Sequence, residues 1–346
     1  MSTFYIFFVA FAAAFVAMPL NIYASKKFGL VDVPKDKRRM HDKPVPTMGG
    51  ITIFIVVIIV ALIFIPHSKR LFSLLLGGVV IAVSGMIDDV KNLRPIYKLI
   101  AQIIAAIIAV SGGLKIQFIS NPFVSNEIID LKLFGTILTI IWIVGVTNAL
   151  NFVDGMDGLC AGLASISAIT FYIASDRGRF APLLALAIAG AALGFLPYNF
   201  NPAKIFMGDT GALFLGYTLA CISIEGVVKS VATISLILPI FILALPVFDT
   251  LFAMIRRKLN GQKIMSADKG HLHHRLVQKG FTVKQTVLIL YAIAIVFSVL
   301  GILIGRVEPS LQFTLSLICL VAVIALAGFF GLFKKNGQDT QQGGIH

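Results

Sequence analysis

The chain has 346 residues, of which 58% are hydrophobic and only 13% are charged. Soluble domains carry about 25% charged residues, so this composition excludes an ordinary soluble domain. The net charge of +13 predicts contact with anionic ligands and with an anionic membrane face, and nucleic acid is not expected as a partner because the basic residues lie in short loops.

Apolar runs of about 20 residues with few charges are typical of transmembrane helices, and they recur along the whole chain. We predict an all-α, polytopic integral membrane protein with about eleven spans, forming a single transmembrane domain over residues 1–333, followed by a polar tail over 334–346. The first run has no basic n-region and no small-residue cleavage site, so it is predicted to be a span and not a signal peptide. The predicted spans are 3–24, 48–66, 71–88, 96–113, 134–150, 157–175, 181–198, 208–225, 231–254, 284–305 and 311–333.

The distribution of basic residues predicts the orientation in the membrane. One set of loops, with the adjacent span ends, holds 21 of the 29 lysines and arginines. The positive-inside rule places this set in the cytoplasm, with the N-terminus outside and the C-terminus in the cytoplasm. The set consists of 25–47, 89–95, 151–156, 199–207, 255–283 and the tail.

The motif HDKPVPTMGG opens the second predicted span at residues 41–50. Its two prolines stiffen the chain, and Gly49 and Gly50 permit close packing or the approach of a ligand. Lys43 is either a phosphate contact or a positive-inside anchor, and the sequence leaves both open.

The third predicted span ends in GMIDDVKNLRP, which contains the adjacent carboxylates Asp88 and Asp89. Neighbouring side chains on a helix point about 100° apart, so the pair need not share one ligand. The alternative interpretation is a polar helix end, with Lys91 and Arg94 as counter-charges.

The stretch NALNFVDGMDGLCAG, residues 148–162, places Asp154 and Asp157 between two apolar runs. Gly155 and Gly158 permit a tight turn or the close approach of a ligand. Capping of the next helix explains one aspartate. It explains both together less well, because no cation lies in this loop.

A third acidic helix start, NFNPAKIFMGDTGALFLG, brings Asp209 to the same predicted face of the membrane. Carboxylates gathered without bases repel one another unless a cation neutralises them. Mg²⁺ fits such a place, since it is usually held by one or two carboxylates together with phosphate oxygens.

The largest predicted cytoplasmic loop contains RRKLNGQKIMSADKGHLHHRL. Such a loop could simply rest on anionic lipid, but donor-rich His and Arg side chains favour a diphosphate or a sugar. A zinc site is not favoured, because no cysteine is near and adjacent histidines point in different directions. The clustered residues are Arg256, Arg257, Lys269, His271, His273, His274 and Arg275.

Together these motifs combine carboxylates for Mg²⁺, a His/Arg cradle for a diphosphate and a membrane-embedded body, as phosphoryl transfer between a nucleotide and a lipid requires. The stretches HDKPVPTMGG, GMIDDVKN, NALNFVDGMDGL, NFNPAKIFMGDTGALFLG and DKGHLHHRL resemble the polyprenyl-phosphate N-acetylhexosamine-1-phosphate transferases in order and over nearly the whole chain. The H-x-H-H pattern at 271–274 is similar to the UDP-GlcNAc branch rather than to the phospho-MurNAc-pentapeptide translocases, which have three successive histidines.

The resemblance implies transfer of GlcNAc-1-phosphate from UDP-GlcNAc to undecaprenyl phosphate, at the cytoplasmic face of a bacterial cytoplasmic membrane. It implies Asp209 as a Mg²⁺ ligand with Asn151 beside it, Mn²⁺ as an alternative ion, and a homodimer as one option. The expected catalytic carboxylates are Asp88, Asp89 and Asp154. The expected substrate contacts are Gly155, Asp157, Asn199 and Phe206 for uridine, Arg257, His271, His273 and His274 for the sugar diphosphate, and Lys43 and Lys98 for phosphates.

The expected mechanism is a direct displacement in which the lipid phosphate attacks the phosphorus that carries the sugar, with Asp88 as the base. The rival is a two-step route through an aspartyl phosphate. Two other classes stay open from the sequence: an ion-coupled transporter, which would place its acids near mid-bilayer and often in inverted repeats, and a non-catalytic scaffold. The one-sided cluster of acids and the absence of a visible repeat favour the transferase.

Overall fold

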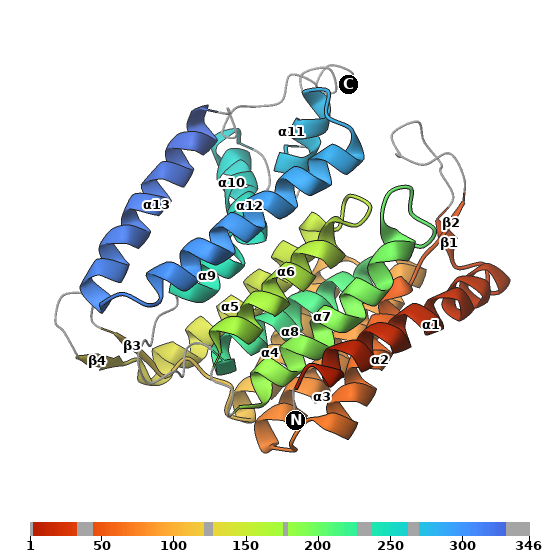
Figure 1. Ribbon diagram of the computed structural model, residues 1–346, viewed down its shortest axis with the longest axis horizontal. Coiled ribbons are helices and arrows are strands. Elements are labelled where there is room, and N and C mark those ends of the chain that lie inside the picture. The colour runs from red at the N-terminus through yellow and green to blue at the C-terminus, as the bar shows by residue number, and fades with distance from the viewer. Residues whose placement is uncertain are drawn as a thin grey trace.

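The computed structural model describes residues 3–32, 44–120, 127–175, 179–226, 237–261 and 270–329, and these residues are mainly helical (Figure 1). The helices are α1 (Tyr5–Lys27), α2 (Gly49–Phe64), α3 (Lys69–Lys91), α4 (Pro95–Ser111), α5 (Lys132–Val153), α6 (Leu159–Ala174), α7 (Phe180–Asn199), α8 (Gly208–Gly226), α9 (Ile237–Ile242), α10 (Ala244–Leu259), α11 (Leu272–Gln278), α12 (Val283–Ile304) and α13 (Pro309–Phe329). The strands are β1 (Val31–Asp32), β2 (Val45–Pro46), β3 (Phe118–Ser120) and β4 (Ile128–Asp130), paired antiparallel as β1–β2 and β3–β4.

Ten of the eleven predicted spans each coincide with one helix, to within a few residues at their ends. The predicted span 231–254 differs, because its described part contains two helices, α9 and α10, separated at Leu243. Pro246 lies in the first turn of α10 and has no N–H to continue a helix from α9. A single uninterrupted helix in this interval was therefore the wrong expectation.

Within the described residues, six helices are long and apolar enough to cross a membrane: α1, α3, α5, α7, α12 and most of α13. Helices α2, α4 and α6 are shorter and apolar. The fold is thus that of a polytopic all-α membrane protein. The number of crossings and the orientation of the termini stay predictions.

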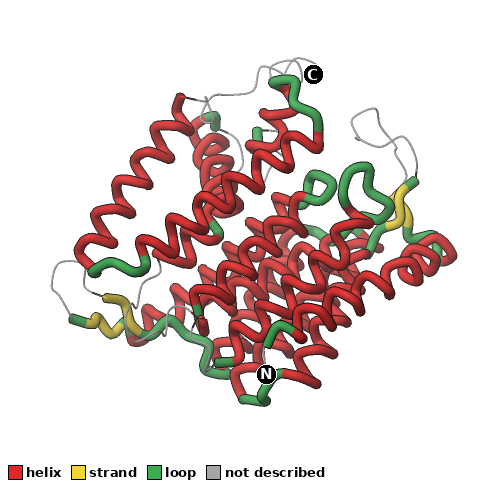
Figure 2. Tube along the Cα trace, in the orientation of Figure 1, coloured by secondary structure: helices red, strands yellow, loops and turns green. Residues whose placement is uncertain are grey.

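Helix α8 forms the centre of the bundle. Every residue from Thr210 to Gly226 is buried, and α2, α3, α5, α6 and α7 pack around it (Figures 1 and 2). Helix α13 lies at the edge of the molecule, where most of its side chains are exposed. A membrane helix can expose apolar side chains to lipid without cost, which explains why the outer helices carry so many.

Helix α2 meets the start of α8 through a close contact of two glycines. A Cβ on Gly50 would lie 2.1 Å from the backbone nitrogen of Gly211. The backbone N–H of Gly50 also donates to the Met207 carbonyl at 2.8 Å, and that of Gly49 donates to the Phe206 carbonyl at 2.9 Å. The two glycines of the HDKPVPTMGG motif therefore fix the loop that leads into α8.

Replacing Gly50 by Ala is expected to destabilise the protein by about 2 kcal/mol, because the added methyl forces the two helices apart. Gly145→Ala is the matched control, since Gly145 lies inside α5 with no atom within 4 Å of its would-be Cβ. Thermal unfolding in detergent measures both variants. Equal melting temperatures for Gly50→Ala and the wild type would contradict the packing argument.

Candidate active site

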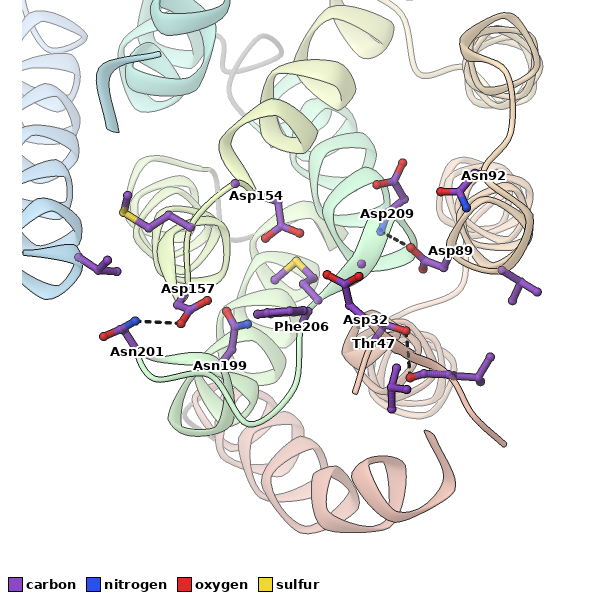
Figure 3. A pocket seen from close by; sticks show the side chains of 18 of the residues that line it. Asp32, Thr47, Asp89, Asn92, Asp154, Asp157, Asn199, Asn201, Phe206 and Asp209 are labelled. Carbon is purple, nitrogen blue, oxygen red and sulfur yellow. Dashed lines mark hydrogen bonds between the residues drawn. The ribbon is translucent and has the colours of Figure 1, made fainter. Parts of the chain in front are cut away.

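A cavity of about 820 Å³ lies at one end of the bundle, where the loops before α6 and α8 meet the end of α3 and the β1–β2 pair. Five carboxylates from these segments surround it, and Figure 3 shows them around one space. Asn199, Phe206 and Asp209 of one motif line it together with His274 of another. The acids are Asp32, Asp89, Asp154, Asp157 and Asp209. The structure brings Asp89, Asp154, Asp157 and Asp209 together around this cavity, and their roles in the reaction stay predictions.

Asp89 connects α3 to the start of α8. One carboxylate oxygen accepts the backbone N–H of Asp209 at 2.7 Å, and the other accepts the backbone N–H of Thr210 at 3.2 Å and its hydroxyl at 2.6 Å. The first amides of a helix have no partner within the helix, so a carboxylate from a neighbouring helix satisfies them here. Asp89 therefore fixes the position of Asp209.

Lys98 of α4 bridges two carboxylates, those of Asp88 and Asp209. Its ammonium group contacts Asp88 at 2.9 Å and Asp209 at 2.7 Å. The remaining oxygen of Asp88 accepts the backbone N–H of Leu93 at 2.6 Å. Lys98 thus neutralises part of the charge of both carboxylates. It lies behind Asp209 and does not line the cavity.

Asp157 and Asn199 hold the two loops of the cavity together. Asp157 accepts hydrogen bonds from the Asn201 amide and the Ala203 backbone, both at 3.0 Å (Figure 3). Asn199 accepts the Gly158 N–H at 3.0 Å and donates to the Ile205 carbonyl at 3.0 Å. The loop so held carries Phe206, whose ring lines the cavity.

The capping interpretation of Asp154 and Asp157 is wrong. The N-cap of α6 is Gly158, which has φ of 81° and no side chain that could cap the helix. Glycine adopts this left-handed conformation without strain, which explains why the motif has a glycine at this position. The two aspartates are thus not needed to start α6. Capping does not explain their presence in the cavity lining.

Asp154 carries the clearest sign of crowded negative charge. Burial, together with repulsion from Asp209, Asp89 and Asp157, raises the pKa of the Asp154 carboxyl well above its usual range. Its carboxyl makes no hydrogen bond within the part of the chain that the structure describes. A cation bound in this space would relieve the repulsion.

The donor set fits Mg²⁺. Carboxylate oxygens are its preferred protein ligands, and one or two of them suffice when substrate phosphates supply the rest. Both oxygens of Asp89 are engaged by hydrogen bonds, whereas Asp157 and Asp209 each have only one oxygen in a described hydrogen bond. The carboxyl of Asp154 has none in the described residues, so Asp154, Asp157 and Asp209 all keep oxygens for a cation. The motif resemblance favours Asp209 among them. Asn151 at the end of α5 lies close to the carboxyl of Asp209. Among the described residues no three acidic, His or Cys side chains converge into a ready-made metal site, so substrate oxygens would have to complete the coordination.

The three histidines form a row beside the cavity. The rings of His271 and His273 are stacked at 5.7 Å, and those of His273 and His274 lie 4.2 Å apart. His274 lines the cavity. A Cβ on Gly155 would lie 3.0 Å from Nε2 of His273, which is buried and has no hydrogen-bond partner in the described residues. Burial and the neighbouring His274 lower the pKa of His273 to about 3, so this ring is neutral.

Other predicted contacts fall elsewhere. Arg257 is buried near the end of α10 and does not line the cavity, and Arg256 beside it packs closely against Gly270. Lys43 lies outside the described residues. Gly155, Asp157, Asn199 and Phe206, predicted as the uridine pocket, do share the cavity.

Sequence reasoning missed four polar residues of the cavity: Asp32, Thr47, Asn92 and Asn201. Asp32 and Thr47 are brought there by the β1–β2 pair, whose strands are too short to be recognised in a sequence. Asn92 ends α3 with φ of 50°, a conformation that Asn tolerates better than most residues. The Asn-Pro dipeptide at 201–202 was a readable turn signal.

Comparison with known proteins gives the family. Residues 71–227 match the model of glycosyl transferase family 4. A Bacillus subtilis protein named "Probable undecaprenyl-phosphate N-acetylglucosaminyl 1-phosphate transferase" is 40% identical over 95% of this chain and 92% of its own length. A decaprenyl-phosphate N-acetylglucosaminephosphotransferase of Mycolicibacterium smegmatis is 35% identical over 77% of the chain and 73% of its length. A phospho-N-acetylmuramoyl-pentapeptide-transferase of Staphylococcus saprophyticus is 31% identical over 86% and 97%.

The helical membrane body and the acidic cavity at its end are those of a membrane-embedded transferase. The chain belongs to the family of polyprenyl-phosphate N-acetylhexosamine-1-phosphate transferases, as its motifs predicted.

Proposed function

We propose that the protein transfers GlcNAc-1-phosphate from UDP-GlcNAc to undecaprenyl phosphate, which yields undecaprenyl-diphosphate-GlcNAc and UMP. The observation that carries the proposal is the similarity, over nearly the full length of both chains, to a protein named for this reaction. The acidic cavity with histidines at its rim supports it, because it offers both cation ligands and donors for a sugar diphosphate. The lipid product would initiate a cell-envelope glycan.

The chemistry requires one phosphorus–oxygen bond to form and another to break. An oxygen of the lipid phosphate attacks the β-phosphorus of UDP-GlcNAc, and the bond to the UMP oxygen breaks. A phosphate monoester has a second pKa of about 6, so at pH 7 it is mostly the dianion and needs little help from a base. Asp88 is held between Leu93 N–H and the Lys98 ammonium, which suits it to orient the acceptor region as much as to take a proton.

Asp209 and Asp154, with Asn151, would hold Mg²⁺, which neutralises diphosphate charge when bound. Lys98 limits the repulsion among the carboxylates around the reacting phosphates. Phe206 offers a flat apolar face on which a uracil ring could stack, and Asn199 and Asp157 keep its loop in place. His274 would offer a ring nitrogen to the sugar diphosphate, and His273 packs behind Gly155 of the cavity wall.

The proposed location is the bacterial cytoplasmic membrane, with the cavity at the cytoplasmic face. Two arguments support this face: the excess of basic residues in the loops around the cavity, and the access that a cytosolic nucleotide needs. The prenyl chain can stay in the bilayer while its phosphate reaches the end of the bundle. A homodimer stays a prediction, which light scattering of the protein in detergent tests.

A direct assay tests the proposal. Purified protein, Mg²⁺, radiolabelled UDP-GlcNAc and undecaprenyl phosphate are expected to give labelled lipid, with UMP released only when the lipid acceptor is present. Chelation should stop the reaction, and Mg²⁺ or Mn²⁺ should restore it. No labelled lipid under conditions where a known member of the family is active would reject the proposal. Transfer from UDP-MurNAc-pentapeptide instead would identify the related translocase activity.

UMP release without acceptor, or a trapped phosphorylated protein, would replace the direct displacement by a two-step route through an aspartyl phosphate. The assay thus separates the two mechanisms as well as the two donors.

A further inference from the structure

Asp249 of α10 lies next to the histidine row, outside the lining of the cavity. One of its carboxylate oxygens contacts Nδ1 of His271 at 2.8 Å. The other accepts the backbone N–H of Leu272, the first residue of α11, at 2.9 Å. Both side chains of the pair are almost fully shielded from solvent, at 9% and 7% exposure for Asp249 and His271.

This double contact fixes both the ring of His271 and the start of the helix that follows it. The bond to Nδ1 selects the ring orientation and places the proton on Nδ1, which leaves Nε2 free to act at the other edge of the ring. The bond to Leu272 holds the start of α11, a helix of only seven residues that would be marginal by itself. The ring of His271 and the helix that follows it are thus tied to the same carboxylate.

The effect reaches the cavity through the stacked rings. His271 stacks on His273 almost in parallel, with 7° between their planes. His273 aims its unpartnered Nε2 at Gly155, and His274 lines the cavity wall. A shift of His271 or of the α11 start would therefore move His273, which packs against Gly155 of the cavity wall, and His274, which lines the cavity.

We propose that Asp249 is a positioning residue for binding of the nucleotide sugar: it clamps His271 and the start of α11, and so sets His273 and His274 against the donor. The proposal rests on the proposed function, since it assigns the histidine row to the UDP-sugar. Asp249 does not line the cavity, so it acts through the histidines and not by touching a substrate.

The test is Asp249→Asn, which keeps the size of the side chain and an oxygen for Leu272 N–H but offers an amide instead of a carboxylate to Nδ1 of His271. We expect KM for UDP-GlcNAc to rise about 10- to 100-fold, the size of effect seen when a carboxylate that orients a functional histidine is removed. KM for undecaprenyl phosphate should stay within about twofold. Asp130→Asn is the matched control, because Asp130 also accepts a helix-start N–H, that of Lys132, but at β4, away from α11 (Figure 1).

A double-mutant cycle supplies the second measurement. His271→Gln alone should raise KM for UDP-GlcNAc by a similar factor. The double variant should have a donor KM no higher than that of His271→Gln, because both substitutions break the same contact between Asp249 and His271. If Asp249→Asn does not fold, His271→Gln, which leaves the bond to Leu272 intact, carries the test by itself.

The outcomes separate the two proposals. A wild-type protein that makes no labelled lipid overturns the proposed function and this inference with it. An active wild type together with an unchanged donor KM in Asp249→Asn and His271→Gln overturns the inference alone. Equal increases in KM for donor and lipid would also overturn it, since they would indicate a general structural role.

Discussion

Replacing Asp209 by Asn is expected to reduce turnover by about 100- to 1000-fold, the loss typical when a group that stabilises charge in the transition state is removed. Asp209 combines three features: it lines the cavity, it is bound by Lys98 at 2.7 Å, and its own backbone is fixed by Asp89. Asparagine keeps the size but not the charge, so the cation loses a charged ligand and the Lys98 ammonium keeps only Asp88 as its carboxylate partner.

Activity in the labelled-lipid assay measures this variant, with a Mg²⁺ titration beside it. A weakened cation site should show a higher Mg²⁺ requirement for any residual rate. Asp130→Asn, at β4, is the control for loss of an aspartate elsewhere in the fold. Wild-type turnover in Asp209→Asn would refute the metal assignment.

Replacing Asp89 by Ala is expected to cost about 3 kcal/mol of stability, because three donors at the buried start of α8 lose a charged acceptor together. Activity should fall about 100-fold as well, since a displacement of roughly 1 Å at a reacting group has that effect. The two losses are expected together because Asp89 is bonded to the backbone of Asp209 itself.

Melting temperature in detergent and the lipid assay measure the two effects of Asp89→Ala. Thr210→Val removes one of the three donors while leaving the carboxylate and the two backbone bonds, and it should cost only about 1 kcal/mol. A melting temperature and activity for Asp89→Ala equal to those of the wild type would show that α8 does not depend on this carboxylate.

The helices of this fold could be predicted well because a long apolar run with few charges has few other stable structures. The exceptions are local. The α9–α10 break depends on prolines inside a run that still reads as continuous, and α11 is a short helix inside a polar loop. The β1–β2 pair has two residues per strand, too few for any periodicity to appear.

The location of the site could be predicted from the sequence, but the role of each residue in it could not. Helix ends on one predicted face had to lie near each other, and Asp89, Asp154, Asp157 and Asp209 do. The sequence could not show that Asp89 bonds the start of α8, because those two residues are 120 positions apart. Nor could it show that Asp249 contacts His271, because those two residues are 22 positions apart in the chain.

The cavity wall is assembled from distant parts of the chain, from Asp32 near one end to His274 and Val283 near the other. The positions of these residues along the chain determine when, during synthesis, the cavity can form. A nascent chain that has inserted α1 to α8 already carries the five acids of the cavity, but it lacks His274 and Val283. The complete cavity wall can therefore form only after α11 and the start of α12 have been synthesised.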